Sequence, residues 1–268
     1  ALSMPDCAKR AGPARRSTVM AHSSTDDRVK TAGESASAAW HIPSHLRFWI
    51  PAAGLLWFDL WSKEWAFSAL PSDAERAWIP GILEFRRSLN DGAVFGVLAG
   101  YVGMFIIASV LALAFVFYLF AHSARFQRAL HVALAMILAG AIGNLYDRSV
   151  NVADVAETTT AAGERRSVIG VLLESKSEDY VRIGDWPTGE HPQTFRRENV
   201  TLRRQGVVRD FIKFIPQFPV WLGRLSGLDV WPWVFNVADA SLVCGVVLLL
   251  LHSLLDRRAP AAVAARAA

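Results

Sequence analysis

The chain has 268 residues, of which 53% are hydrophobic and ten are tryptophan, and its mean hydropathy is positive, at +0.27. No Asp, Glu, Lys or Arg occurs from residue 92 to residue 121, a longer run than the roughly 20 residues that a membrane-spanning helix needs. These features exclude an ordinary soluble domain and predict an integral membrane protein. The net charge of +4 does not come from a basic patch with interleaved aromatic residues, so we expect no nucleic-acid partner.

Residues 1–45 are rich in Ala, Ser, Arg and Asp and hold no apolar run, so we expect a disordered cytoplasmic tail. The first apolar segment covers about residues 46–61. Asp59 and Lys63 lie near its end, four positions apart and therefore on one face of a helix. From the sequence, this pair could belong to a site or could equally snorkel to the membrane interface.

Two further apolar segments follow at about residues 102–120 and 129–145, joined by a short loop. The second of them ends in Gly-Asn-Leu-Tyr-Asp-Arg, residues 143–148. Asn144 and Arg148 therefore lie one helical turn apart on the same side of a helix.

The chain is polar from about residue 149 to residue 205, where only short apolar runs occur. Two of these runs, 167–174 and 180–183, have the composition of short strands and predict a hairpin. We interpret this region as a soluble excursion of a loop and not as a separate domain. Residues 211–233 then mix aromatic residues and prolines, and Trp221, Trp231 and Trp233 suit the aromatic belt of a membrane interface.

The fourth apolar segment, about residues 234–255, opens with Asn236 and Asp239 and precedes an Ala-rich tail at 259–268. Ionisable residues are costly in a spanning helix, so they usually face a bundle interior or a wet cavity and act with a partner. The partner that we expect is Asp210. Two adjacent carboxylates can share one proton, so that one acts as a base while the other acts as an acid. This is the chemistry of an aspartyl hydrolase.

The charges of the loops predict the orientation of these segments. Residues 1–47 carry a net charge of +3, and residues 122–128 and 256–268 carry +2 each, whereas the rest of the chain sums to −3. The positive-inside rule makes these three segments cytoplasmic. Polar groups at the ends of the apolar segments then meet at the outer face, namely Asp59, Asn90, Asn144, Arg148, Asn236 and Asp239. We therefore expect an all-α membrane protein: a four-helix transmembrane bundle with a small β-rich periplasmic layer formed by two long loops.

Five motifs in the chain occur in the order that is typical of the lipoprotein signal peptidases (signal peptidase II), and the chain resembles this family. They are Asp59-Leu-Trp-Ser-Lys63, Asn90-Asp-Gly-Ala-Val-Phe-Gly, Gly140-Ala-Ile-Gly-Asn-Leu-Tyr-Asp-Arg148, Val207-Val-Arg-Asp-Phe-Ile and Phe235-Asn-Val-Ala-Asp-Ala. The resemblance implies a multi-pass aspartyl endopeptidase of the bacterial inner membrane, with its active site at the periplasmic face. Such an enzyme removes the signal peptide from diacylglyceryl-modified prolipoproteins, cutting before the lipidated cysteine.

The resemblance also implies a role for each site residue. Asp210 and Asp239 would be the catalytic pair and would need no metal and no cofactor. Donors such as Asn90, Asn144 and Arg148 would orient substrate carbonyls. The residues that support the site or hold substrate would be Asp59, Lys63, Asn90, Gly92, Asn144, Asp147, Arg148 and Asn236. The partners would be lipid-modified prolipoproteins and membrane lipids, and the protein would be monomeric.

One departure from the family concerns the spacing of its motifs. In typical members only a few residues separate the motif arginine from the catalytic aspartate, whereas Arg148 and Asp210 are 62 positions apart here. The polar region between them is therefore an insertion at about residues 149–205. We expect its two ends to lie close together, so that the motifs remain adjacent in space.

Other functions remain to be weighed against this hypothesis. Membrane carboxylates also serve proton-coupled transport, but a transporter would place charges near the bilayer midplane in repeated halves, and no internal repeat is visible. Tyr146-Asp147 gives a superficial likeness to presenilin-like proteases, whose second motif, Gly-x-Gly-Asp, is absent; serine and zinc peptidase signatures are missing too. Taken singly, Asn236 could join helices, Arg148 could anchor the interface, and Asp239 could be a helix N-terminal acid.

Overall fold

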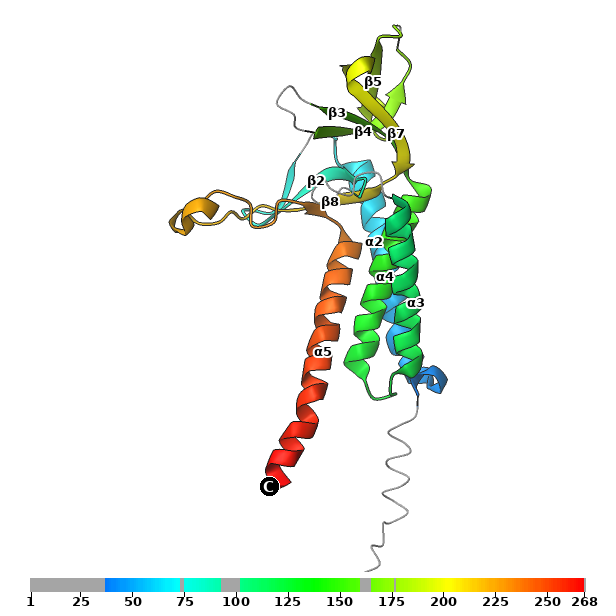
Figure 1. Ribbon diagram of the computed structural model, residues 1–268, viewed down its shortest axis with the longest axis vertical. Coiled ribbons are helices and arrows are strands. Elements are labelled where there is room, and N and C mark those ends of the chain that lie inside the picture. Colours follow the sequence, from blue (N-terminus) through cyan, green and yellow to red (C-terminus); the bar gives the residue numbers. More distant parts are fainter. Residues whose placement is uncertain (1–36, 73–74, 93–101, 160–164, 176, 268) are drawn as a thin grey trace, which may run out of the picture.

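The computed structural model describes residues 37–267 apart from 73–74, 93–101, 160–164 and 176. Most of the expected N-terminal tail, residues 1–36, lies outside the described residues. Long helices form one end of the molecule and two antiparallel sheets form the other (Figure 1). The long helices are α2 (Ile42–Ala69), α3 (Val102–His122), α4 (Arg128–Val150) and α5 (Val237–Ala267).

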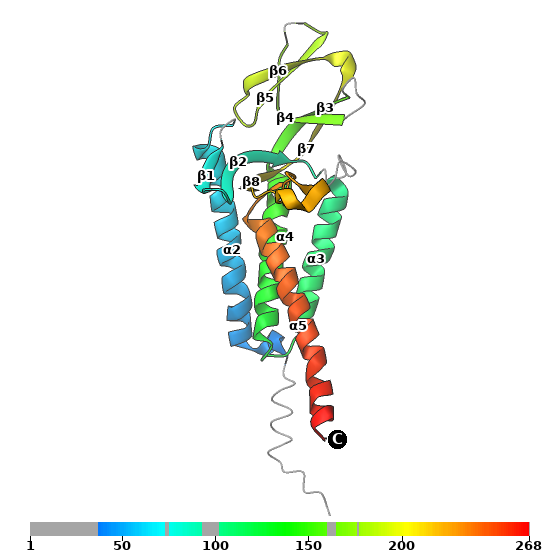
Figure 2. The same ribbon diagram turned by 90° about the vertical axis from the view of Figure 1, so that its left-hand side faces the viewer.

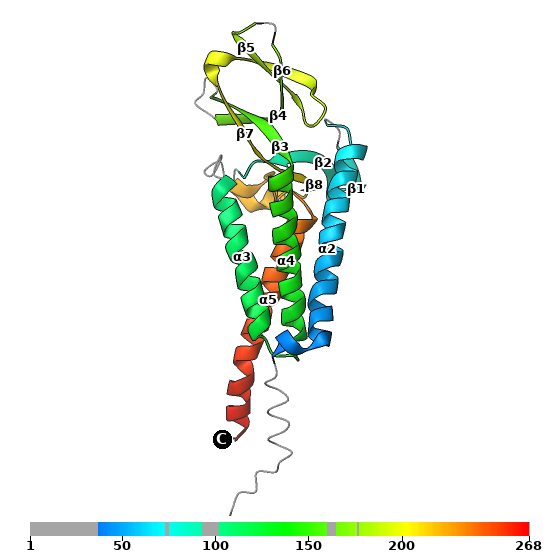
Figure 3. The ribbon, with the colours of Figure 1, turned by 90° about the vertical axis from the view of Figure 1, so that its right-hand side faces the viewer.

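Helix α4 is the centre of the helical part and packs against each of the other three long helices. Figures 2 and 3 show it between them from two sides. Small residues on α4 permit this approach: a Cβ atom at Gly140 would overlap the carbonyl oxygen of Ala238 on α5. The apolar core between the helices includes Phe48 from α2, Phe120 from α3 and Leu134 from α4, all of which are buried.

The described residues include two helices that are long and apolar enough to cross a membrane, α4 and the Val237–Leu255 part of α5. Helix α3 adds a shorter apolar stretch, Ile106–His122. Helix α2 carries charges near its end, including the Asp59 and Lys63 pair.

The expected all-α class, a four-helix transmembrane bundle with a small β-rich layer, is wrong. The strands form a four-stranded and a five-stranded sheet, and only the two helices named above qualify as spans among the described residues. Beyond the expected β-rich layer and hairpin, most strands escaped prediction, because several of them lack a buried apolar face: β6 (Glu190–Arg196) is exposed along almost its whole length, and β2 (Leu83–Asn90) is half-buried throughout. Backbone pairing holds such strands together, and this pairing leaves no mark on composition.

The four-stranded sheet lies across the ends of the long helices (Figure 1). Its strand order is β1-β2-β8-β9, and its further strands are β1 (Arg76–Ile79), β8 (Val208–Phe214) and β9 (Val234–Phe235). Strands β2 and β8 pair antiparallel, with Ser88 opposite Asp210. Because β9 pairs with β8 and leads directly into α5, the sheet brings Asp210 beside the first turn of that helix.

The inserted region forms the five-stranded sheet, with the order β6-β5-β4-β3-β7. Its further strands are β3 (Val152–Thr159), β4 (Arg165–Leu173), β5 (Tyr180–Asp185) and β7 (Val200–Gly206). Strands β4 and β5 pair antiparallel, which confirms the predicted hairpin. Val152 lies opposite Gly206, and the Val207 amide donates to the Asn151 carbonyl at 2.9 Å. The two ends of the insertion therefore lie together, as expected from the sequence.

Residues 216–233, between β8 and β9, form an arm that projects sideways near the start of α5 (Figure 1). Backbone hydrogen bonds join its two sides: the Phe218 amide donates to the Leu228 carbonyl and the Val230 amide to the Pro216 carbonyl, both at 2.9 Å. The helical turn η4 (Val220–Leu225) lies in the arm and exposes Trp221 by 80%.

Candidate active site

The polar residues that the sequence singles out meet where α2, α4 and α5 end against the four-stranded sheet. One continuous set of hydrogen bonds and ion pairs joins them. Its members are Asp59, Lys63, Asn90, Asn144, Asp147, Asp210, Asn236 and Asp239. The structure thus brings together residues that are far apart in the chain and that come from five different elements.

Asp210 is almost completely buried, with 2% of its surface exposed. It accepts hydrogen bonds from Asn236 Nδ2 at 2.6 Å and from Asn90 Nδ2 at 3.1 Å. Burial raises the pKa of the Asp210 carboxyl well above its usual value, and the negative charge of Asp239 raises it further. The two amide donors and the charge of Lys63 oppose this rise without cancelling it. The Asp210 carboxyl therefore holds a proton more readily than an exposed aspartate does.

Asn90 reaches Asp210 because the end of β2 is fixed on both sides. It lies opposite Val208 in the β2–β8 pair, and its Oδ1 accepts a hydrogen bond from the Gly92 amide at 2.8 Å. Gly92 has a φ of +87°, a conformation that glycine adopts without steric cost. Gly92 thus supports the site by holding the Asn90 side chain in place.

Asp239 lies in the first turn of α5 and is half-buried. Asn236 and Asp239 cap the helix reciprocally: the Asp239 amide donates to Asn236 Oδ1 at 2.9 Å, and the Asn236 amide donates to Asp239 Oδ2 at 3.2 Å. Asn144 Nδ2 donates to the other oxygen, Oδ1, at 2.7 Å. These two donors fix the orientation of the Asp239 carboxylate at the N-terminus of α5.

Lys63 is fully buried and orders the amide of Asn144. Its Nζ donates to Asp59 Oδ2 at 2.8 Å and to Asn144 Oδ1 at 3.2 Å, and it lies 3.3 Å from Asp147 Oδ2. Because the ammonium group occupies the Oδ1 side of Asn144, the Nδ2 group is directed to Asp239. Lys63 therefore determines that Asn144 presents its Nδ2 group, and not its Oδ1 atom, to Asp239.

Asp59 and Lys63 are not an exposed pair that snorkels to the interface, because their side chains are 1% and 0% exposed. Asp59 Oδ1 accepts a hydrogen bond from the Ala238 amide at 2.8 Å, at the start of α5. A Cβ atom at Gly143 on α4 would overlap Asp59 Oδ2. Asp59 therefore joins α2 to α5, and only a glycine at position 143 leaves room for its carboxylate.

Two charged residues of this network, Arg209 and Glu64, were missed by sequence reasoning. Arg209 Nη2 contacts Asp147 Oδ1 at 2.9 Å, its backbone amide donates to Asp147 Oδ2 at 3.0 Å, and its Nη1 contacts Glu64 Oε2 at 2.9 Å. Burial lowers the pKa of Arg209, but the charge of Asp147 and the hydrogen bonds to both carboxylates raise it overall. The signal in the sequence was an arginine inside an apolar strand, directly before Asp210.

Arg148 lies at the end of α4, and its charge interacts with those of Asp239, Asp210, Asp147 and Asp91. The backbone of Arg148 is packed so closely that a Cβ atom at Gly206 would overlap its carbonyl oxygen. Gly206 ends β7, so this contact holds the insertion directly against the site.

This arrangement offers two carboxyl groups with different surroundings, one buried and one at a helix N-terminus, linked through the single residue Asn236. Such a pair can act as a general acid and a general base. Among the described residues, no group of three or more His, Cys, Asp or Glu side chains could hold a metal ion.

Comparison with known proteins identifies the family. The family model described as signal peptidase (SPase) II matches residues 52–255. The lipoprotein signal peptidase of Rhodopirellula baltica is 31% identical over 200 residues, which cover 73% of this chain and 66% of the relative. That of Listeria welshimeri is 35% identical over 180 residues, which cover 67% of this chain and 75% of the relative.

The fold is also similar to a solved structure, described as a bacterial membrane enzyme at 2.3 Å resolution. The TM-score is 0.50 at 20% sequence identity, and the match covers 81% of this chain and 91% of the other. The family model extends from α2 through the insertion to α5 and so includes every residue of the network described above. The chain therefore belongs to the signal peptidase II family, the aspartic peptidases of membranes that remove signal peptides from lipoproteins.

Proposed function

We propose that Asp210 and Asp239 are the catalytic carboxyl groups, and that they cleave diacylglyceryl-modified prolipoproteins before the lipidated cysteine. The observation that carries this proposal is the position of Asn236. Its Nδ2 binds Asp210 at 2.6 Å, while its backbone amide and Oδ1 bind Asp239. One residue thus sets the relative position of both carboxyl groups.

The different surroundings of the two groups assign their roles. Asp239, at the start of α5, acts as the base and accepts a proton from water as the water oxygen attacks the scissile carbonyl carbon. Asp210, protonated, donates its proton to the carbonyl oxygen, which gives a tetrahedral diol. Asp239 then passes its proton to the leaving nitrogen of the lipidated cysteine as the C–N bond breaks. Asp210 recovers a proton from the diol, which becomes the new carboxyl group.

The other site residues support this chemistry in two ways. Asn90 and Asn144 donate to the carboxyl groups themselves, so in this state they orient the pair and not substrate carbonyls. The charge of Arg148 interacts with the charges of both carboxyl groups, so Arg148 can orient a substrate carbonyl and stabilise charge on its oxygen. Lys63, Asp59 and Asp147 fix these donors from behind.

An apolar cavity of about 330 Å³ beside Asp239 suits the lipid-modified part of the substrate. Its walls come from β8, the arm, β9 and α5, and Asp239 is its one charged lining residue. The apolar residues that line it are Phe214, Val230, Trp231, Phe235, Ala240 and Val243. We place the site at the outer face of the bacterial inner membrane, where both lipid and water reach it, and the partners are the lipid-modified prolipoproteins and the membrane lipids.

The test is cleavage of a diacylglyceryl-modified peptide by purified Asp210→Asn and Asp239→Asn proteins. Each variant should lose at least about 10³-fold in kcat/KM, since each removes an acid or base. Asp179→Asn, at an exposed position of the insertion, is the matched control and should keep full activity. Near-normal turnover by either site variant would show that the two carboxyl groups are not the catalytic pair.

A further inference from the structure

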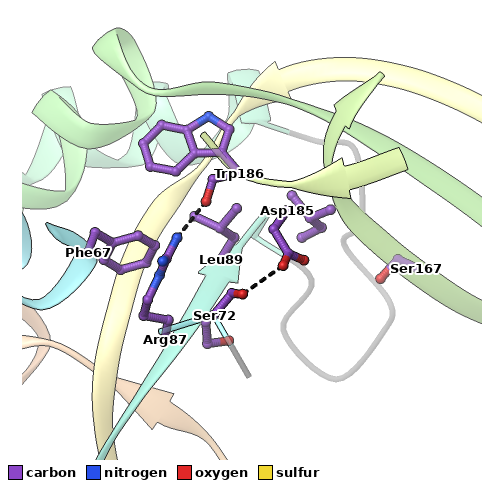
Figure 4. A pocket seen from close by; sticks show the side chains of 9 residues that line it. Phe67, Ser72, Arg87, Leu89, Ser167, Asp185 and Trp186 are labelled. Carbon is purple, nitrogen blue, oxygen red and sulfur yellow. Dashed lines mark hydrogen bonds between the residues drawn. The ribbon is translucent and has the colours of Figure 1, made fainter. Parts of the chain in front are cut away.

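A polar cavity of about 280 Å³ lies in the seam between the catalytic core and the inserted sheet. Figure 4 shows its lining side chains reaching in from both parts. From the core come Phe67, Ser72, Arg87, Ser88 and Leu89, and from the insertion come Ser167, Ile169, Asp185 and Trp186. Ligand pockets of proteins usually begin at roughly 300 Å³, so this cavity suits a few residues of a chain.

Specific contacts hold the two walls of this cavity in place. Arg87 Nη2 donates to the Trp186 carbonyl at 2.5 Å, and its guanidinium lies 4.8 Å from the centre of the Phe67 ring (Figure 4). Ser72 Oγ donates to Asp185 Oδ2 at 2.7 Å (Figure 4). The seam is therefore a fixed cleft with one cationic and one anionic side chain at its walls.

Hydrogen-bonding capacity remains unused in this cleft. The hydroxyl groups of Ser88 on the core and Ser167 on the insertion make no hydrogen bond to any residue that the structure describes. Strand β1 pairs with β2 only over the stretch from Leu83 to Phe85. Beyond Phe85, the described part of β2 therefore has a partner strand on the β8 side alone. An extended peptide can add to a strand edge by main-chain hydrogen bonds.

The cleft also adjoins the catalytic pair, because Ser88 is the cross-strand partner of Asp210. The cavity beside Asp239 is apolar, whereas this one is polar. The substrate of the proposed function has the same division. Its signal peptide and acyl chains are apolar, and the chain that follows the lipidated cysteine leaves the membrane for water.

We propose that the seam binds the segment of the substrate that follows the lipidated cysteine, as an extended chain along β2, and that the insertion is a specificity element for this segment. This inference rests on the proposed function. The residues that carry it are Ser88 and Ser167, which would bond to the peptide backbone, and Arg87 and Asp185, which would select its side chains by charge.

The test compares two diacylglyceryl-modified peptides. One ends directly after the lipidated cysteine, and the other continues for about ten residues, or roughly 33 Å of extended chain. Ser167→Trp and Ile169→Trp fill the cavity from the insertion side. Each should lower the ratio of kcat/KM for the long peptide to that for the short one by about tenfold. Thr194→Trp, exposed on β6 of the same sheet, is the matched control and should leave this ratio unchanged.

The outcomes separate the inference from the proposed function. An unchanged ratio in both cavity-filling variants would overturn the inference, and so would a parallel loss on both peptides, which would make the seam a structural support. If the unmodified protein cleaved neither peptide, the proposed function itself would fail.

A second measurement does not depend on catalysis. In an Asp239→Asn background, a photo-crosslinking residue at Ile169 should attach to the long peptide beyond its cysteine and not to the short peptide. The same residue at Thr194 should attach to neither. Equal labelling at the two positions would also overturn the inference.

Discussion

At the scale of single residues, Asp210 gives the protein a stability that depends on pH. Burial and the charge of Asp239 raise the pKa of Asp210 in the folded protein above its value in the unfolded chain. The folded state therefore holds this proton more tightly. The contribution of Asp210 to the stability of the protein is highest below the ordinary aspartate pKa, near 3.9, and falls as pH rises through the raised pKa of the folded state.

Asp210→Asn removes this titration, so the variant should melt at a higher temperature than the unmodified protein at neutral and alkaline pH. The difference should shrink as the pH falls toward the ordinary aspartate pKa. Melting of the detergent-solubilised protein over a series of pH values measures this, with Asp179→Asn as the exposed control. A difference in melting temperature that is the same at every pH would contradict the prediction.

Lys63 stabilises the site because it is the buried cation between Asp59 and Asp147. Lys63→Met leaves these carboxylates without their shared partner, and removing one member of a buried ion pair typically costs about 3–5 kcal/mol. It also frees the Asn144 amide to turn away from Asp239, so kcat should fall with little change in KM. Adding Asp59→Asn to Lys63→Met should restore part of the stability. Strictly additive losses in the double variant would show that the two side chains do not interact.

The sequence predicted which residues form the site better than it predicted the hydrogen bonds between them. Asp210 and Asp239 stand out because ionisable side chains are rare beside apolar segments, and the motifs brought in Asn90 and Asn144 as well. That these two amides bind the carboxyl groups depends on rotamers set by Lys63 and Gly92 across different elements. Arg209 was missed because its partner Asp147 lies 62 positions away.

At the scale of elements, the positions of the long helices followed from the apolar runs, whereas those of most strands did not. The runs predicted spans within α2, α3, α4 and α5, because a helix satisfies its backbone locally and shows its burial in composition. The strands satisfy their backbone across large sequence distances, as β2 does with β8. No local pattern reports such pairing. The sequence therefore predicted a small β-rich layer in two long loops and one hairpin, but not the two sheets or their strand orders.

Helix α4 approaches Asp59 of α2 so closely at Gly143 that no larger side chain fits there. Gly143→Ala places a methyl group against Asp59 Oδ2, which should displace this carboxylate from the Ala238 amide and lower activity about tenfold or more. Gly54→Ala on α2 is the matched control, because nothing lies within 4 Å of its Cβ position. It should keep activity and gain up to about 1 kcal/mol from helix propensity. Equal activity of the two variants would contradict this account of the packing.

The arm at residues 216–233 should lie in the membrane interface. It projects sideways where α5 begins (Figure 1). Within the arm, Val220 is 88% exposed and Trp221 is 80% exposed. Tryptophan favours the headgroup region, where its ring meets both lipid and water. A spin label at Trp221, with Cys7 and Cys244 replaced by Ser, should be more accessible to oxygen than to a water-soluble relaxing agent in lipid nanodiscs. A label at Thr194 should show the reverse, and similar profiles at both positions would refute the interfacial placement.

At the scale of the whole molecule, the insertion is a separate sheet built on a core that closes without it. Two sets of contacts close the core on its own side of the insertion's ends. The Val207 amide donates to the Asn151 carbonyl, and Arg209 contacts Asp147. Val152 and Gly206 face each other as the first pair of the β3–β7 ladder. The core therefore needs only a short turn at this position to keep Asn144 and Asp210 together.

Replacing residues 153–205 by Asn-Gly, the sequence favoured in two-residue hairpin turns, should give a protein that inserts and cleaves the short diacylglyceryl peptide. The deletion also removes the insertion's wall of the seam, including the contacts of Asp185 with Ser72 and of Trp186 with Arg87. The preference for the long peptide should therefore disappear while cleavage of the short peptide remains within about tenfold of the unmodified rate, a change of less than 1.4 kcal/mol in barrier height. Complete loss of cleavage by a folded, inserted deletion protein would show that the insertion completes the catalytic site, because the core alone would then fail to hold Asp210 against Asp239.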